Sequence, residues 1–398
     1  MARIEGDGGF PGGRVTGLPN PRPTPARPSA GDGWPVDQYE RAPARVERFT
    51  APRPTSVSEP SAVGVPGASA STGTPRIPVL SLDLHARLAV TGAYDSQGQG
   101  VLGLTQAQVE EFVRLGYQHA VIGLPTPWVD RYDEAFGAAR QEAQLLAQNG
   151  IAVDAYRYLF WQKDGKPRSA EEVYKDVWDS LQVLDGQPVG TFWLDVEADR
   201  VYNPAIRDRS GDVDVEATQE RVAAAHQAFV DWKAAQRAAL ENEEEALWRE
   251  RASLSPAEYR TERAALAERR ERLEAMQVGI YTSKAAWTEL MGGTDAYARQ
   301  GLPVWAARYP SVDYLPGDDL NAAFGSQMEP FGGWSVEDGT IVGWQWSDGR
   351  GERRQDFSET RFAVDRNVFY VDPSRLPGAE PEAPARHVRL PPGRPIPV

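Results

Sequence analysis

The stretch Val189–Asp199 constrains the fold of this chain more than any other. It is short, apolar, aromatic and β-branched, and it follows Gly186 and Pro188, so it predicts a buried β-strand. Side chains alternate across a strand. One face of this strand carries Phe192, Leu194 and Val196, and the other carries Trp193, Asp195 and Glu197.

The pair Asp195-x-Glu197 is the chemical feature of this strand. In a parallel β/α barrel, the apolar face packs on outer helices, and the two acids point into the mouth where such barrels hold their active sites. Two carboxylates about 7 Å apart on one strand face repel each other and are costly to bury. An isolated pair of this kind is more commonly a solvated strand end, so the rest of the chain decides between the two interpretations.

Composition excludes several classes of protein. With no cysteine there are no disulfides and no thiolate zinc sites, and the four scattered histidines do not suggest a metal cluster, so we expect no metal and no cofactor. The net charge of −14 argues against a nucleic-acid partner. No run is long enough for a membrane span, and the N-terminus lacks the apolar core of a signal peptide. We therefore expect a protein made in the cytoplasm.

The chain has three compositional zones. Residues 1–76 are rich in Pro, Gly and Ser and predict either a disordered linker or an extended arm that docks through isolated aromatic residues. Residues 77–372 predict the folded part, and residues 373–398 form a Pro-rich tail.

Strands and helices alternate within the folded part, which predicts a parallel sheet with helices outside it. Strands are expected near 77–85, 119–123, 151–160, 189–196, 277–282, 302–309, 340–346 and 362–370. Helices are expected near 105–115, 135–148, 170–184 and 284–291.

Residues 212–277 interrupt this alternation and are rich in Ala, Glu, Arg and Gln. A first helix is expected over about Asp214–Glu250, spanning roughly 55 Å at 1.5 Å per residue. A second helix begins at Ser255-Pro-Ala-Glu258, a capping box with proline at the first helical position. We interpret this insert as a helical hairpin that stands off the barrel.

Six short motifs occur in a characteristic order. They are Asp83 in the first strand, Asp195-x-Glu197, Gly279-Ile-Tyr-Thr-Ser283, Pro303-Val-Trp-Ala-Ala-Arg-Tyr309, Trp344-Gln-Trp-Ser-Asp-Gly349 and Val364-Asp-Arg-Asn-Val-Phe369. This set resembles glycoside hydrolase family 25, the lysozymes that cut peptidoglycan between N-acetylmuramic acid and N-acetylglucosamine. The resemblance covers about residues 77–372, apart from the insert.

The resemblance implies an α/β fold, an irregular TIM-like β/α barrel with an acidic groove. It implies Glu197 as the general acid and Asp195 as the partner that stabilises positive charge at the sugar carbon or orients a nucleophile. Asp83 and Asp365 would complete the acidic cluster. Crowded carboxylates in a cleft push their pKa values apart, which suits acid and base roles.

Aromatic residues near the strand ends are candidates for binding sugar rings, because aromatic faces stack on sugars. They are Tyr156, Tyr158, Trp305, Tyr309, Trp344 and Trp346. Trp193 is instead expected in the core. Two features depart from the family: His85 replaces a small hydroxyl residue, and Gly123-Leu-Pro-Thr-Pro127 replaces a charged segment. His85 is either a core histidine or a new groove residue.

The leading functional hypothesis is a muramidase acting on bacterial peptidoglycan. Residues 1–76 and the insert would attach it to particle or tail proteins of a phage or phage-like particle, which would carry it to the cell wall; lysis is the other route. The alternative is a catalytically weak or inactive barrel that serves as a structural or glycan-binding virion protein, since fold alone does not guarantee chemistry.

Overall fold

The computed structural model describes residues 77–84, 93–94, 100–101, 104–125, 132–198, 203–309, 319–347 and 365–371. The chain divides into two units, Met1–Gly64 and Val65–Val398, and the first unit lies outside the described residues. The N-terminal arm and the C-terminal tail expected from the sequence therefore stay predictions.

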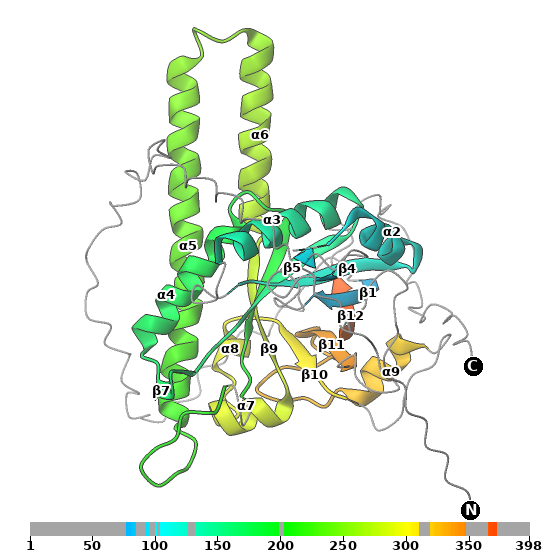
Figure 1. Ribbon diagram of the computed structural model, residues 1–398, viewed down its shortest axis with the longest axis vertical. Helices are drawn as coiled ribbons and strands as arrows, with labels where there is room; N and C mark the ends of the chain where they lie inside the picture. Colours follow the sequence, from blue (N-terminus) through cyan, green and yellow to red (C-terminus); the bar gives the residue numbers. More distant parts are fainter. Residues whose placement is uncertain are drawn as a thin grey trace, which may run out of the picture. The chain divides into compact units, whose positions relative to one another are not determined.

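Eight strands close into a barrel at the centre of the second unit (Figure 1). The strands are β1 (Ile77–Leu84), β4 (Tyr117–Gly123), β5 (Ala152–Tyr158), β8 (Val189–Asp195), β9 (Gln277–Thr282), β10 (Val304–Ala307), β11 (Ile341–Ser347) and β12 (Asp365–Val371). Their order around the barrel is β1-β12-β11-β10-β9-β8-β5-β4. The barrel predicted from the sequence is thus confirmed.

One strand departs from the expected parallel arrangement. β12 runs antiparallel to both of its neighbours, β1 and β11, whereas the other six pairings are parallel. This reversal brings Asp365, the first residue of β12, opposite Asp83 near the end of β1. Strand direction depends on long-range pairing and therefore has no local sequence signal.

Helices and short hairpins connect the barrel strands. The helices are α2 (Gln106–Arg114), α3 (Tyr132–Gln148), α4 (Ala170–Leu181), α5 (Val215–Glu250), α6 (Pro256–Ala275), α7 (Lys284–Met291), α8 (Ala296–Arg299) and α9 (Leu320–Gln327), with a 3₁₀ turn η2 at Gln182–Leu184. The hairpins pair β2 (Ala93–Tyr94) with β3 (Gly100–Val101) and β6 (Gln162–Lys163) with β7 (Lys166–Pro167). Ser255 forms the capping box that its sequence predicts, and Thr105 and Ser169 form capping boxes as well.

Alternation along the strands separates two apolar cores. Phe192, Leu194 and Val196 of the β8 segment belong to the outer core, between the barrel and its helices. Trp193 belongs to the inner core, inside the barrel. Gly279 of β9 leaves room for the Trp193 indole, because a Cβ at this position would collide with the ring. The assignment of faces made from the sequence is therefore correct for this strand.

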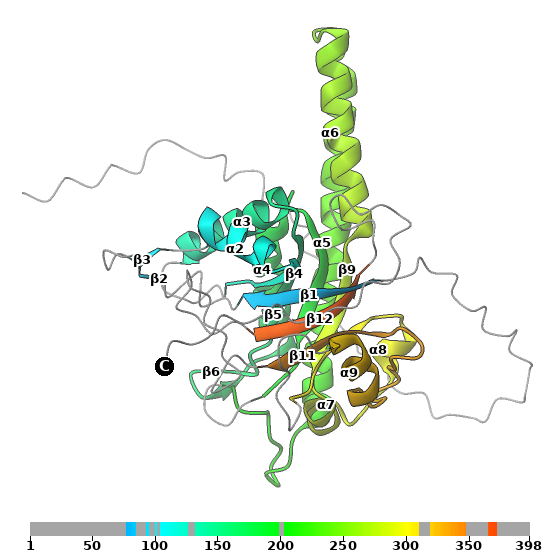
Figure 2. The ribbon, with the colours of Figure 1, turned by 90° about the vertical axis from the view of Figure 1, so that its right-hand side faces the viewer.

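The insert forms two antiparallel helices, α5 and α6, that extend side by side away from the barrel (Figures 1 and 2). The first half of α5 is different, since it packs on α4 and on the barrel, burying Val222, Phe229 and Trp232. The expectation that the whole insert stands off the barrel is wrong for this half. Its buried apolar stripe has the spacing of an ordinary barrel helix.

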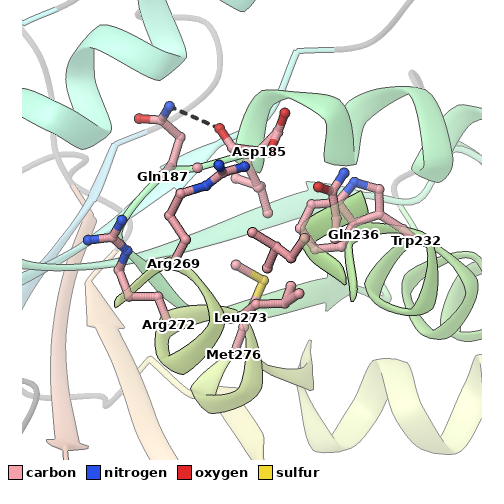
Figure 3. Close-up of a pocket in the computed structure, with 11 residues that line it drawn as sticks. Asp185, Gln187, Trp232, Gln236, Arg269, Arg272, Leu273 and Met276 are labelled. Atoms are coloured by element: carbon pink, nitrogen blue, oxygen red, sulfur yellow. Dashed lines mark hydrogen bonds between the residues drawn. The ribbon is translucent and has the colours of Figure 1, made fainter. Parts of the chain in front are cut away.

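The base of the hairpin is closely packed. A small cavity of about 30 Å³ separates α5, α6 and the turn before β8, and Figure 3 shows Trp232, Gln236 and Met276 around it. Lys233 Nζ donates to the carbonyl oxygen of Met276 at 2.7 Å. These contacts fix the point at which α6 returns the chain to β9.

Candidate active site

Three acidic side chains meet at the barrel mouth. Asp83 lies near the C-terminal end of β1, Asp195 ends β8, and Glu197 follows two residues later. Asp83 and Asp195 are buried, 8% and 4% exposed, whereas Glu197 is half-buried. Because β1 and β8 both run in the parallel direction, their carboxyl ends lie at the same edge of the barrel, as the sequence predicted.

Burial and repulsion perturb the innermost of these acids. The pKa of Asp195 is raised well above its usual range, chiefly by burial and then by the negative charges of Glu197 and Asp83. The Arg157 guanidinium opposes this shift by lowering the pKa. Asp195 therefore holds a proton more readily than a free aspartate does, which is the behaviour expected of crowded carboxylates in an active site.

Tyr281 and Gln345 stand beside the acids, and the sequence-based list of site residues omitted both. The Tyr281 hydroxyl donates to Gln345 Oε1, which also accepts from the Tyr309 hydroxyl at 3.3 Å. The pKa of Tyr281 is raised well above its usual range by burial, and then by Glu197, Tyr309, Asp195 and Asp83. Tyr281 consequently stays a neutral hydrogen-bonding group beside the carboxylates.

The backbone that carries Glu197 is held on several sides. Trp161 Nε1 donates to the carbonyl oxygen of Glu197 at 2.6 Å, and Asn203 Nδ2 donates to the same atom at 3.3 Å. Thr282 Oγ1 donates to the carbonyl oxygen of Val196 at 2.8 Å. These fixed partners limit the directions in which the Glu197 side chain can leave the strand end.

A second buried polar group lies deeper in the barrel. Ser81 Oγ and His119 Nδ1 are 2.7 Å apart, and His119 Nε2 lies 3.2 Å from Asp154 Oδ2. Asp154 also accepts hydrogen bonds from the Thr191 amide at 2.7 Å and from Trp193 Nε1 at 3.0 Å. All five residues are at most 5% exposed, so this group supports the floor of the barrel and is closed to a polymer substrate.

Four of the predicted sugar-binding aromatics lie on the inner face of the barrel and differ in depth. Tyr158 is partly exposed beside Asp195, Tyr309 is 46% exposed, and Tyr156 lies beneath them in the inner core. Trp305 is fully buried inside the barrel, where its Nε1 donates to Asn367 Oδ1 at 3.0 Å. Only Tyr158 and Tyr309 of these four therefore offer a surface at the mouth.

Trp344 and Trp346 are not brought to the acids. Both belong to the outer core, 0% and 2% exposed, and Trp344 Nε1 donates to the carbonyl oxygen of Arg308 at 2.8 Å. Their expected role in stacking on sugar is corrected to packing, because no indole face is open. Alternation within Trp344-Gln-Trp346 instead turns Gln345 toward the mouth, and that signal would have identified it.

Two predicted residues lie outside what the structure describes. The backbone of Asp365 pairs with Asp83, but its side chain is outside the described part, as is all of His85. In the described residues, no group of three acids or histidines has the arrangement of a metal site. No helix within those same ranges is long and apolar enough to cross a membrane.

A larger cavity of about 600 Å³ opens at the same edge of the barrel, where β9 and β10 end. Ser283, Lys284 and Arg308 are among its lining residues, whereas Asp83, Asp195 and Glu197 are not. The three acids therefore do not line this cavity. They lie at the ends of β1 and β8, at the same edge of the barrel.

Together these features define a closed β/α barrel with a carboxylate cluster at its C-terminal mouth, an arrangement found in barrel hydrolases. Neither a protein-family model nor a curated protein sequence matches the chain. Its fold is similar to solved structures of muramidases and lysozymes.

Three of these structures show the extent of the similarity. A muramidase from Trichobolus zukalii is 14% identical with a TM-score of 0.37, covering 75% of this chain and 96% of that one. A bacterial lysozyme from Streptomyces coelicolor is 15% identical with a TM-score of 0.35, covering 75% and 94%. A pneumococcal cell wall endolysin from phage Cp-1 is 12% identical with a TM-score of 0.35, covering 75% and 55%. At these values the function has to be argued from the site itself.

Proposed function

We propose that this protein is a muramidase that hydrolyses the β-1,4 bond between N-acetylmuramic acid and N-acetylglucosamine in peptidoglycan. The observation that carries the proposal is the acid cluster, in which a half-buried Glu197 stands above the buried Asp195 and Asp83. Glycoside hydrolysis generally needs two carboxyl groups with different roles beside one glycosidic bond. The six motifs that resemble glycoside hydrolase family 25 favour a wall glycan as substrate.

The solvent exposure of the three carboxyl groups favours different catalytic roles for them. Glu197 is the member of the cluster with surface open to solvent, so it donates the proton to the leaving glycosidic oxygen. Asp195 and Asp83 lie beneath it, and in its ionised form this pair stabilises the oxocarbenium-like charge on the sugar, although Asp195 gives up its proton less readily than a free aspartate does. Tyr281 and Gln345 are buried and hydrogen-bonded to each other, so they position the neutral groups beside these charges, while the exposed Tyr309 that also bonds Gln345 is the one open to a sugar.

A cell-wall assay tests the proposal directly. Purified walls of several chemical types are incubated with the full chain, and reducing-sugar release is measured alongside wall binding. We expect release of reducing ends, and loss of that release in Glu197→Gln. A protein that binds walls but releases nothing would instead be the structural or glycan-binding barrel.

We also propose that the chain works while attached to a phage or phage-like particle. The distal part of the α5–α6 hairpin supports this, because it extends from the barrel and carries exposed charges that no catalytic role requires (Figure 2). Residues 1–76 are the second proposed attachment segment. Co-purification of particle proteins with the full chain, and their loss from a chain starting at residue 77, is the expected result.

A further inference from the structure

The cavity at the ends of β9 and β10 has a chemistry that the acid cluster lacks. Two cations, Lys284 and Arg308, line it together with two carboxylates, Glu289 and Glu329. Glu329 Oε2 lies 2.8 Å from Lys284 Nζ, and Glu329 Oε1 lies 3.4 Å from Arg308 Nη1. Each carboxylate oxygen thus faces one cation, so the carboxylate of Glu329 bridges the pair.

This bridge is open to exchange. The three side chains are between 40% and 59% exposed, and ion pairs at such positions contribute little stability. Glu329 takes up one donor on each cation, while an ammonium has three donors and a guanidinium has five. Lys284 and Arg308 can therefore bind a second carboxylate that enters the cavity, beside Glu329 or in its place.

The cavity also lies within reach of the acids. Lys284 lies two residues after the end of β9, Arg308 follows β10 directly, and Asp195 ends β8, which neighbours β9. Two strand spacings are about 10 Å, so a ligand bound at the acids can extend into the cavity. Part of the cavity lining is apolar and includes Met328 and Phe331.

From this geometry we infer that the cavity between Lys284, Arg308 and Glu329 binds a short peptide branch of the glycan through the free carboxylate groups of that branch. The inference rests on the proposed function, because it takes the backbone bound at the acids to be peptidoglycan. The acidic mouth repels such carboxylates, and the two cations attract them. The polymer is thereby oriented so that its sugars face Glu197 and its peptide faces Arg308.

Binding of three defined probes tests this inference. They are one tetrasaccharide with peptides whose carboxylates are free, the same compound with those carboxylates converted to amides, and the peptide-free tetrasaccharide. Affinity is measured by calorimetry with full-length Glu197→Gln, which prevents turnover. We expect the free-carboxylate probe to bind about threefold to fivefold more tightly than its amide, with the difference shrinking at high salt.

Two variants that should change the preference for free carboxylates in opposite directions make the test specific. Arg308→Gln should remove the preference for free carboxylates, and Glu329→Gln should enlarge it, because the competing carboxylate is gone. Arg299→Gln is the matched control, since this α8 arginine is 72% exposed and pairs with Asp295, the N-cap residue of α8, outside the cavity. The affinity for the peptide-free probe should stay the same in all three variants.

The outcomes separate this inference from the proposed function. If the wild type cleaves the peptide-free glycan but binds free and amidated probes equally, the peptide site is refuted and the muramidase stands. If the preference follows Arg308 and Glu329 but nothing is cleaved, the peptide site stands and the muramidase is refuted. If no probe binds at all, both are refuted.

Discussion

The barrel mouth and the α5–α6 hairpin both concentrate charge, but they do so in opposite ways. At the mouth, Asp83 and Asp195 are buried next to Glu197, and burial, followed by repulsion between the acids, raises the pKa of Asp195. Along the hairpin, charges of opposite sign face each other in water, as in the pairs Arg269–Glu243 and Arg270–Glu244.

The two arrangements have different energetic consequences. Buried like charges destabilise a fold, so they persist where chemistry requires them. Exposed opposite charges contribute at most about 1 kcal/mol per pair, and they keep a long helix pair soluble. We therefore expect replacement of the crowded acids at the mouth to raise stability, and we expect the barrel to fold without the distal hairpin.

The largest expected effect is that of Glu197→Gln on hydrolysis. The amide keeps the shape of the side chain but has no proton to transfer, so activity should fall by about 10²- to 10⁴-fold. Reducing-sugar release from cell walls measures this loss, and binding to wall fragments should persist. Glu262→Gln, at an exposed position on α6, is the matched control and should keep full activity. Full activity in Glu197→Gln would place the chemistry elsewhere.

Asp195→Asn should separate function from stability. Its folded-state pKa is raised, so the native state binds more protons than the unfolded state, and stability falls as pH rises through the interval between the two pKa values. The amide removes this penalty. We expect a higher melting temperature than wild type at pH 7, little difference at pH values low enough to protonate the aspartate in both states, and strongly reduced hydrolysis. A lower melting temperature at pH 7 would contradict the electrostatic argument.

A buried acid outside the mouth isolates the cost of burial alone. Glu142 on α3 is 3% exposed, and burial raises its pKa from 4.5 to about 7, against a backbone hydrogen bond from Leu104. Stability should therefore fall between about pH 4.5 and pH 7 and stay low above that range. Glu142→Gln should recover about 3 kcal/mol at pH 8 and almost nothing at pH 4, while hydrolysis is unchanged. Denaturant unfolding at the two pH values measures this, and equal effects at both would refute it.

The sequence predicted the features that depend on local patterns and missed those that depend on pairing between distant segments. Strand alternation placed Asp195 and Glu197 on the inner face correctly, because one apolar face and one polar face leave a single consistent arrangement. Local signals also fixed Ser255 as a helix cap. The reversed direction of β12 depends on pairing between distant segments, and no local pattern encodes it.

Errors arose where residue type was given more weight than strand face. Trp344 and Trp346 suit a sugar groove by chemistry, yet they point to the outer core, and the glutamine between them points inward to the Tyr281 hydroxyl. The half of α5 that covers the barrel was likewise hidden by its charged composition. Its buried residues Val222, Phe229 and Trp232 become recognisable only when their spacing is followed.

The smallest expected effect belongs to the distal hairpin. Replacing residues 243–265 by a short Gly/Ser linker removes the pairs Glu243–Arg269 and Glu244–Arg270 and keeps the buried Leu266 and the half of α5 that contains Phe229 and Trp232. We expect a change of a few degrees in melting temperature at most and unchanged hydrolysis, because exposed pairs contribute little. Removing residues 216–272 instead should abolish cooperative unfolding, since truncating even one buried Phe or Trp costs about 3–5 kcal/mol. Calorimetry of both deletions checks the contrast, and equal damage from the two would mean that the distal hairpin belongs to the barrel core.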